Sequence, residues 1–157
     1  MKMKIFTYIC MAVFVMIMSS QAYSKEIPRV AKVVELEGEV EAKLSGQENW
    51  VPVQKNMILN QGDIIKTKSK SFALIILNGS GETSEIEISE NSQLLILELM
   101  TDDKDGAQTT LLDLAIGKVL IRAKELHNEN SRFEIKTPTS VVGVRGTTFS
   151  VEVEALE

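Results

Sequence analysis

Short runs of apolar and β-branched residues, separated by turn residues, dominate the chain from about residue 30 onward. Residues 64–67 and 72–77 are two such runs, and residues 85–88 alternate charged and apolar side chains as a half-buried strand does. Residues 111–126 would also suit a helix, but Gly117 and the β-branched residues after it argue against one. The pattern predicts a single all-β domain of stacked, mainly antiparallel sheets, either a sandwich or a short solenoid.

The first 24 residues have the organisation of a secretory signal peptide. Lys2 and Lys4 precede an apolar run of about 14 residues, and residues 22–24 fit the small-x-small pattern of a cleavage site. Because a membrane span needs roughly 20 residues, cleavage after Ser24 is favoured over an uncleaved anchor. We therefore expect a helical signal peptide at 1–24 and a β domain at 25–157. The processed protein is expected in the periplasm or outside the cell, without stable membrane insertion.

Composition after residue 24 excludes several kinds of chemistry. The only cysteine, Cys10, lies in the middle of the apolar run, so neither lipidation, a disulfide nor a cysteine zinc site is expected. The first 24 residues hold two lysines and no acidic residue, which leaves 15 basic and 22 acidic residues and a formal charge of −7. An acidic surface disfavours nucleic acid and anionic lipid as partners.

The candidate catalytic and metal-binding residues form no complete motif. His127, the only histidine, lies in a polar loop with no nucleophile nearby in sequence, so an exposed loop histidine is favoured over a general base. Residues 101–106 resemble a calcium loop, but Thr101 occupies the first ligand position and Leu112 the closing glutamate position. We interpret this loop as a charged hairpin tip and expect no catalytic residue, metal or cofactor.

Two other features point to contacts rather than to catalysis. Trp50 is one of few aromatic residues after residue 24 and is a candidate partner contact, and Pro52 predicts that its strand lies at a sheet edge. Residues 137–149 read TPTSVVGVRGTTF, in which Pro138 should end one strand and redirect the chain. Gly143 and Gly146, which flank Arg145, suit a bulge or a close backbone approach.

The setting of Arg145 between these glycines and valines predicts a partly buried guanidinium. Such a group needs a carboxylate or carbonyl partner, and Asp63 is the first candidate, with Asp113 behind it. Two interpretations remain open. In the first, Arg145 is an internal clasp that closes the fold; in the second, it is a ligand for an acidic group on another molecule.

The segment 137–151, TPTSVVGVRGTTFSV, resembles the terminal signature of the FecR-type domain, T-P-x-[AS]-x-x-x-V-R-G-T-x-F-x-V. Earlier pieces match in order, including residues 36–40, the 60–67 segment with Gly62 and Asp63, residues 73–80 and a Gly-Lys-Val at 117–119. The similarity spans residues 30–153. The signature residues carried over to this chain are Gly62, Asp63, Pro138, Gly143, Arg145, Gly146, Thr147 and Phe149.

The resemblance implies an all-β extracytoplasmic module. In the best-known members this module is the periplasmic part of a regulator that relays a signal from a siderophore transporter to a cytoplasmic sigma factor. Only Met1–Lys4 precede the apolar run here, so we expect a stand-alone exported module that lacks the anti-sigma segment. The first hypothesis is a non-catalytic module that binds a protein or envelope component. The alternatives are a component of sigma-factor signalling that acts through a separate partner, and a cryptic hydrolase.

Overall fold

A computed structural model describes residues 25–77, 84–123 and 128–154, and the described residues form an all-β fold, as predicted. The predicted signal peptide of residues 1–24 lies outside the described residues. The strands are β1 (Glu26–Pro28), β2 (Ala31–Glu37), β3 (Val40–Lys43), β4 (Trp50–Pro52), β5 (Ile58–Leu59), β6 (Ile64–Thr67), β7 (Phe72–Leu77), β8 (Ser84–Ile88), β9 (Gln93–Asp102), β10 (Gln108–Arg122), β11 (Arg132–Lys136), β12 (Val141–Val144) and β13 (Thr148–Val153).

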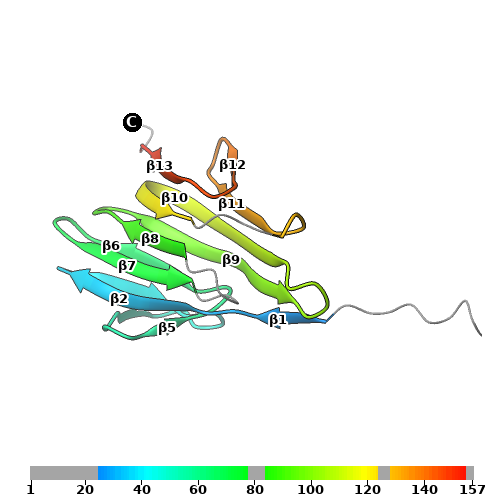
Figure 1. The fold of residues 1–157 in the computed structure, drawn as a ribbon. Helices are drawn as coiled ribbons and strands as arrows, with labels where there is room; N and C mark the ends of the chain where they lie inside the picture. The colour runs from blue at the N-terminus through cyan, green and yellow to red at the C-terminus, as the bar shows by residue number, and fades with distance from the viewer. Residues whose placement is uncertain (1–24, 78–83, 124–127, 155–157) are drawn as a thin grey trace, which may run out of the picture.

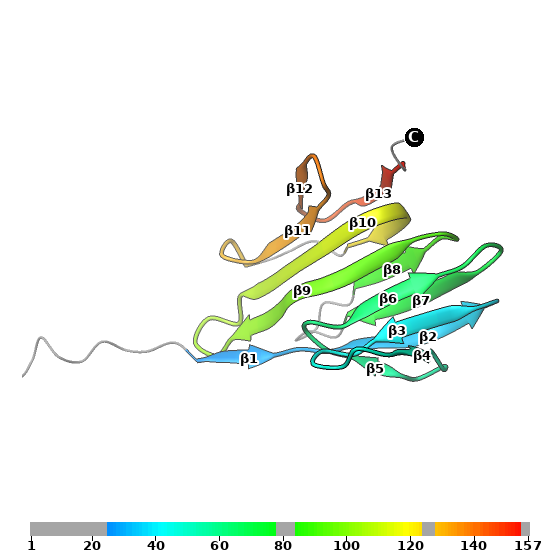
Figure 2. The ribbon, with the colours of Figure 1, turned by 180° about the vertical axis from the view of Figure 1, so that it is seen from behind.

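The strands form one sheet that curls over itself like a half-barrel, in the order β4-β3-β6-β9-β10-β8-β7-β2-β5 (Figure 1). We call the part containing β4, β3, β6, β9, β11 and β12 layer A, and the part containing β5, β2, β7, β8 and β13 layer B. Among the described residues, only the β10–β11 pairing is parallel. Both views place β12 and β13 at the opposite side of the molecule from β5, and Figure 2 shows β4 beside β5 (Figures 1 and 2).

β10 joins the two layers. Its first half pairs with β9 and β11 in layer A, and its second half pairs with β8 and β13 in layer B. Between the halves, the register with β9 shifts between Leu114 and Ile116, and Gly117 has a φ of +90°. The segment for which a helix was argued against is therefore one continuous strand as far as Arg122, in which Gly117 makes a bend rather than a break.

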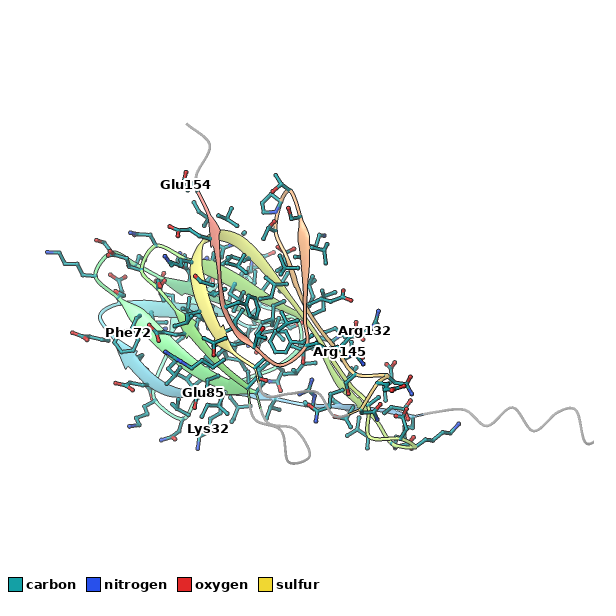
Figure 3. The ribbon with its side chains drawn as sticks, turned by 45° about the horizontal axis from the view of Figure 1, so that its top comes forward. Lys32, Phe72, Glu85, Arg132, Arg145 and Glu154 are labelled. Carbon is teal, nitrogen blue, oxygen red and sulfur yellow. The ribbon has the colours of Figure 1, made fainter. Side chains whose placement is uncertain are left out.

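The core lies between the layers and follows the two-residue period of the strands. In β8, Ile86 and Ile88 are fully buried while Glu85 and Glu87 reach solvent, which confirms the predicted alternation. In β7, Ala73, Ile75 and Leu77 are buried and the intervening residues are half-buried, so this strand is fully covered on one face only. Lys32, Phe72 and Glu85 point outward from layer B (Figure 3).

The chain passes between the layers at two corners of the same construction, each a glycine packed against a serine. Gly38 has a φ of +75° and faces Ser71, whose Oγ accepts a hydrogen bond from the amide of Glu39. Gly117 faces Ser92 in the same way, and Ser92 Oγ accepts from the amide of Lys118 at 2.9 Å. At both corners the residue before the serine, Lys70 or Asn91, also has a positive φ. The two serine–amide bonds fix the points at which the sheet folds over.

Candidate functional site

The motif at residues 137–149 spans the β11–β12 hairpin and the start of β13. Thr137 begins the hairpin turn: its amide donates to the Ser140 carbonyl at 2.8 Å, and its hydroxyl oxygen accepts from the Ser140 amide at 3.0 Å. Pro138 is exposed in this turn, where it ends β11, as predicted. Phe149 lies in β13 opposite Ile121 and packs, half-buried, against the core. The Thr147 carbonyl accepts from the amide of Ala123 at 3.3 Å, which ties the start of β13 to β10.

The two glycines of the motif differ in their roles. Gly146 has a φ of +79° and turns the chain from β12 toward β13. Gly143 pairs in regular register with Glu134, and a Cβ placed on it would meet nothing within 4 Å. The expected bulge or close approach at Gly143 is therefore wrong, because this residue sits at an open position of an ordinary strand.

The expected burial of Arg145 against Asp63 is also wrong. Arg145 is exposed, and its Nη2 donates to the main-chain carbonyl of Glu129 at 3.4 Å. The Asp63 carboxylate accepts instead from two backbone amides, and Asp113 lies 4.0 Å from the Lys136 ammonium. The physical reason is the turn at Gly146, which holds Arg145 at the outer corner between β12 and β13 rather than facing the core.

Arg145 and Arg132 line a shallow hollow of roughly 360 Å³ beside the β11–β12 hairpin. Figure 3 labels the two residues near each other. Glu129 and Glu134 also line the hollow. Within the described parts of the chain, neither guanidinium is within 4.0 Å of a carboxylate. Two solvent-facing guanidinium groups at one hollow can hold a carboxylate or phosphate through paired hydrogen bonds.

Asp63 has a structural role in the turn before β6. It is 2% exposed, and its carboxylate accepts from the amides of Ser45 and Asn60, each at 2.7 Å. Its neighbour Gly62 has a φ of +90° and donates its amide to the Ile96 carbonyl. The carboxylate thereby ties the loop at Ser45 to the loop at Asn60, while the backbone of Gly62 holds this turn against β9.

Replacing Asp63 by asparagine should lower the free energy of unfolding by about 2 kcal/mol, because one of the two amides loses its acceptor and faces an NH₂ group instead. Urea unfolding followed by circular dichroism measures the change. Asp103→Asn, at an exposed hairpin position, serves as the control and should remain within about 0.5 kcal/mol. Equal losses for the two variants would show that the Asp63 carboxylate does not hold the turn.

The clasp that one of the two interpretations predicted at Arg145 is formed instead by Arg29, which is half-buried. Its Nε donates to the Met100 carbonyl at 3.0 Å and its Nη1 to Gln108 Oε1 at 2.9 Å. Its Nη2 donates to the Thr109 carbonyl at 3.0 Å and to the Thr110 hydroxyl. The guanidinium therefore fastens the segment before β2 to the β9–β10 pair. The only sequence signal was a lone arginine ahead of an apolar strand.

Trp50 lies half-buried in β4, the edge strand of layer A, so the edge position predicted from Pro52 is confirmed. The Lys66 ammonium sits 4.0 Å from the centroid of the indole ring and 3.1 Å from the Glu41 carboxylate. One face of Trp50 is thus covered by a cation that Glu41 holds in place. The hydrogen bond from Lys66, together with the nearby charge of Lys68, lowers the pKa of Glu41 below its usual value of 4.5.

Trp50 fluorescence should report this arrangement, since Trp50 is the only tryptophan. Because the pKa of Glu41 is lowered in the folded state, its contact with Lys66 is complete above pH 4.5 and is lost as the pH falls through the folded pKa. Protonation frees the ammonium from the carboxylate, so the emission should titrate with a midpoint below 4.5. The step should vanish in Glu41→Gln; a step that persists in this variant would contradict the arrangement.

The hairpin tip at residues 102–106 uses its carboxylates in hydrogen bonds within the tip and to neighbouring segments, since Asp103 accepts from the Lys25 amide and Asp105 from the Asn130 side chain. Asp102 accepts from the Lys104 amide and Asp105 from the Ala107 amide, each at 2.8 Å. Over residues 25–77, 84–123 and 128–154, no group of three or more His, Cys, Asp or Glu side chains could hold a metal ion. Those ranges also contain no helix with the length and apolarity of a membrane span. His127 lies outside the described residues.

Comparison with known protein families shows the family to which the chain belongs. The family model described as FecR protein matches residues 63–156, more than half of the 157 residues and all the strands from β6 to β13. The chain belongs to the FecR family. No curated protein matches it, and no solved structure does. FecR domains are associated with periplasmic signalling and are typically periplasmic, and the family is generally non-catalytic.

Proposed function

We infer that this protein is an exported, non-catalytic binding module, and that it attaches to another protein or to a cell-envelope component through the hollow at Arg145 and Arg132. Residues 1–24 act as a signal peptide, and residues 25–157 are the FecR-type β domain that operates in the periplasm or outside the cell. The observation that carries this proposal is the exposure of Arg145, the arginine of the FecR motif.

The two arginines of the hollow support a proposal for the group that it binds. The carbonyl of Glu129 engages one nitrogen of Arg145, which leaves further guanidinium donors pointing to solvent. Arg132 adds a second cation at the same hollow. An acidic side chain, a chain-terminal carboxylate or a phosphate on the partner is the matching group, because each accepts two parallel hydrogen bonds from an arginine.

Trp50 offers a second contact surface on the far edge of the sheet, at β4 (Figure 2). Its indole is half-exposed, as anchors of protein interfaces are before binding. Lys66 and Glu41 already hold the ring, so Trp50 would present a fixed surface rather than a mobile one.

Site-specific photocrosslinking in the native cell envelope tests this function. A photoreactive residue at Gly143 lines the hollow and has open space around it, whereas one at Lys55 lies on a distant exposed loop. We expect position 143 to give a discrete adduct that mass spectrometry identifies, and Arg145→Glu to reduce it at least tenfold. Position 55 should not give that adduct. No specific adduct at 143, or one indifferent to Arg145→Glu, would refute the proposal.

Family membership favours a second candidate, a component of sigma-factor signalling that acts through a separate membrane partner. If the protein acts in sigma-factor signalling, deleting its gene should change the transcripts controlled by one sigma factor. The crosslinked partner should then be a transporter or a membrane regulator. Neighbouring genes for a sigma factor or transporter would favour it. Unchanged transcripts together with a structural envelope partner would exclude it.

A further inference from the structure

The open edge of β13 lies beside an apolar groove with an acidic rim. The groove has a volume of roughly 500 Å³. Its apolar lining comes from three places, namely Ile116 at the β10 bend, Pro138 and Val142 in the β11–β12 hairpin, and Val151 and Val153 in β13. Ile116 remains 38% exposed, which is unusual for a large aliphatic side chain next to a core. Glu152 and Glu154 also line the groove, and no basic residue does.

Two strands border the groove, and each has a strand partner on one side only within the described residues. β12 pairs with β11, and β13 pairs with β10. β12 and β13 diverge from the turn at Gly146 and rise from the sheet as two separate ribbons (Figures 1 and 3). Because an open strand edge displays unpaired main-chain donors and acceptors, it is a template for one more strand.

The register identifies which groups of β13 face outward. The amide of Ala123 donates to the Thr147 carbonyl, so the β10–β13 ladder bonds fall at Thr147 and at every second residue after it. The amides and carbonyls of Thr148, Ser150 and Glu152 therefore point to the open edge. On the other side of β10, the Lys118 carbonyl accepts from the Ser89 amide, which agrees with this alternation, since Lys118 is opposite Glu152.

We propose that the β13 edge binds an extended segment of a partner protein, which adds to layer B as one more strand and fills the groove. The hydrogen-bonding groups of an open edge require an extended backbone in the occupant. The apolar lining requires alternate apolar side chains. The acidic rim requires lysine or arginine, because Glu154 has no ion pair among the described residues and Glu152 has Lys118 alone.

This inference rests on the proposed binding function, and it names the form of the partner. The two ideas fail separately, because the groove and the hollow at Arg145 share no lining residue. A crosslinked partner at Gly143 without strand binding at β13 would retain the function and refute the inference. Strand binding at β13 without any adduct at Gly143 would retain the inference and refute the proposed binding through the hollow.

The test uses the protein purified after export under its own N-terminal segment, with a phage-displayed library of random decapeptides as the probe. We expect selected peptides to alternate apolar residues and to contain lysine or arginine. A synthetic copy should slow amide exchange at Ser150 and Glu152 at least tenfold. Methylating alternate backbone nitrogens of the peptide should weaken binding at least tenfold, since those nitrogens then donate no hydrogen bond.

Variants of the edge complete the test. Ser150→Pro removes an outward amide without removing a bond to β10, so the protein should fold normally and bind the peptide at least tenfold more weakly. Ser150→Ala keeps the amide and should bind within twofold, while Glu154→Lys should weaken binding several-fold. Failure to select peptides, or protection at another strand, would refute the proposal. A dimer that Ser150→Pro dissociates would also refute it and assign the edge to a second copy.

Discussion

Alanine at Gly117 should lower the free energy of unfolding by at least about 3 kcal/mol. A Cβ on Gly117 would lie 2.2 Å from Ser92 Oγ and 2.5 Å from Ser92 Cα, both far inside contact distance. The Cα belongs to the main chain of the segment that leads into β9, so it cannot rotate away as a side chain can. The φ of +90° adds strain for any residue with a side chain. Urea unfolding followed by circular dichroism measures the loss.

Gly143→Ala is the matched control for this variant. A Cβ there meets nothing within 4 Å, and Gly143 has no positive φ, so the free energy of unfolding should change by no more than about 0.5 kcal/mol. If the two alanines destabilise the protein equally, the bend of β10 does not depend on the contact between Gly117 and Ser92.

Alanine at Arg29 should lower the free energy of unfolding by about 3 kcal/mol. The change leaves two main-chain carbonyls, a glutamine oxygen and a threonine hydroxyl without their shared donor. It also releases the segment before β2 from strands about 70–80 residues away in sequence. The amide of Arg29, which donates to the Leu99 carbonyl, remains in place, so the loss reports on the side chain.

Arg29→Lys and Arg132→Ala complete this experiment. Lysine keeps the charge but cannot direct donors in a fixed fork, so it should recover less than half of the loss. Arg132 is exposed, and its alanine variant should remain within about 0.5 kcal/mol of the wild type. A lysine variant as stable as the wild type would mean that charge, and not hydrogen-bond geometry, holds the segment.

Most strands could be predicted from sequence because their residues alternate or cluster in ways that no helix shares. The ranges predicted at 64–67 and 72–77 coincide with β6 and β7. The short strands β1 and β5 were not predicted, because two or three residues carry no period. The fold-over of the sheet also went unrecognised, since it depends on Ser71 and Ser92 lying against glycines far away in sequence.

The site was predicted less well because it depends on which way single side chains face. The valines and glycines around Arg145 predicted a partly buried guanidinium, but the positive φ of Gly146 places Arg145 at an outer corner. The clasp formed by the half-buried Arg29 could not be predicted from sequence, in which this residue is seen only to precede an apolar strand. Its four acceptor residues lie on β9 and β10, which no local pattern connects to it.

Thermal unfolding of Arg145→Ala, beside the wild type and Arg29→Ala, tests most directly whether the motif arginine is free for a partner while Arg29 closes the fold. We expect Arg145→Ala to melt within about 2 °C of the wild type, and Arg29→Ala to melt on the order of 10 °C lower. A fall for Arg145→Ala as large as that for Arg29→Ala would contradict the account, because Arg145 would then be the structural clasp.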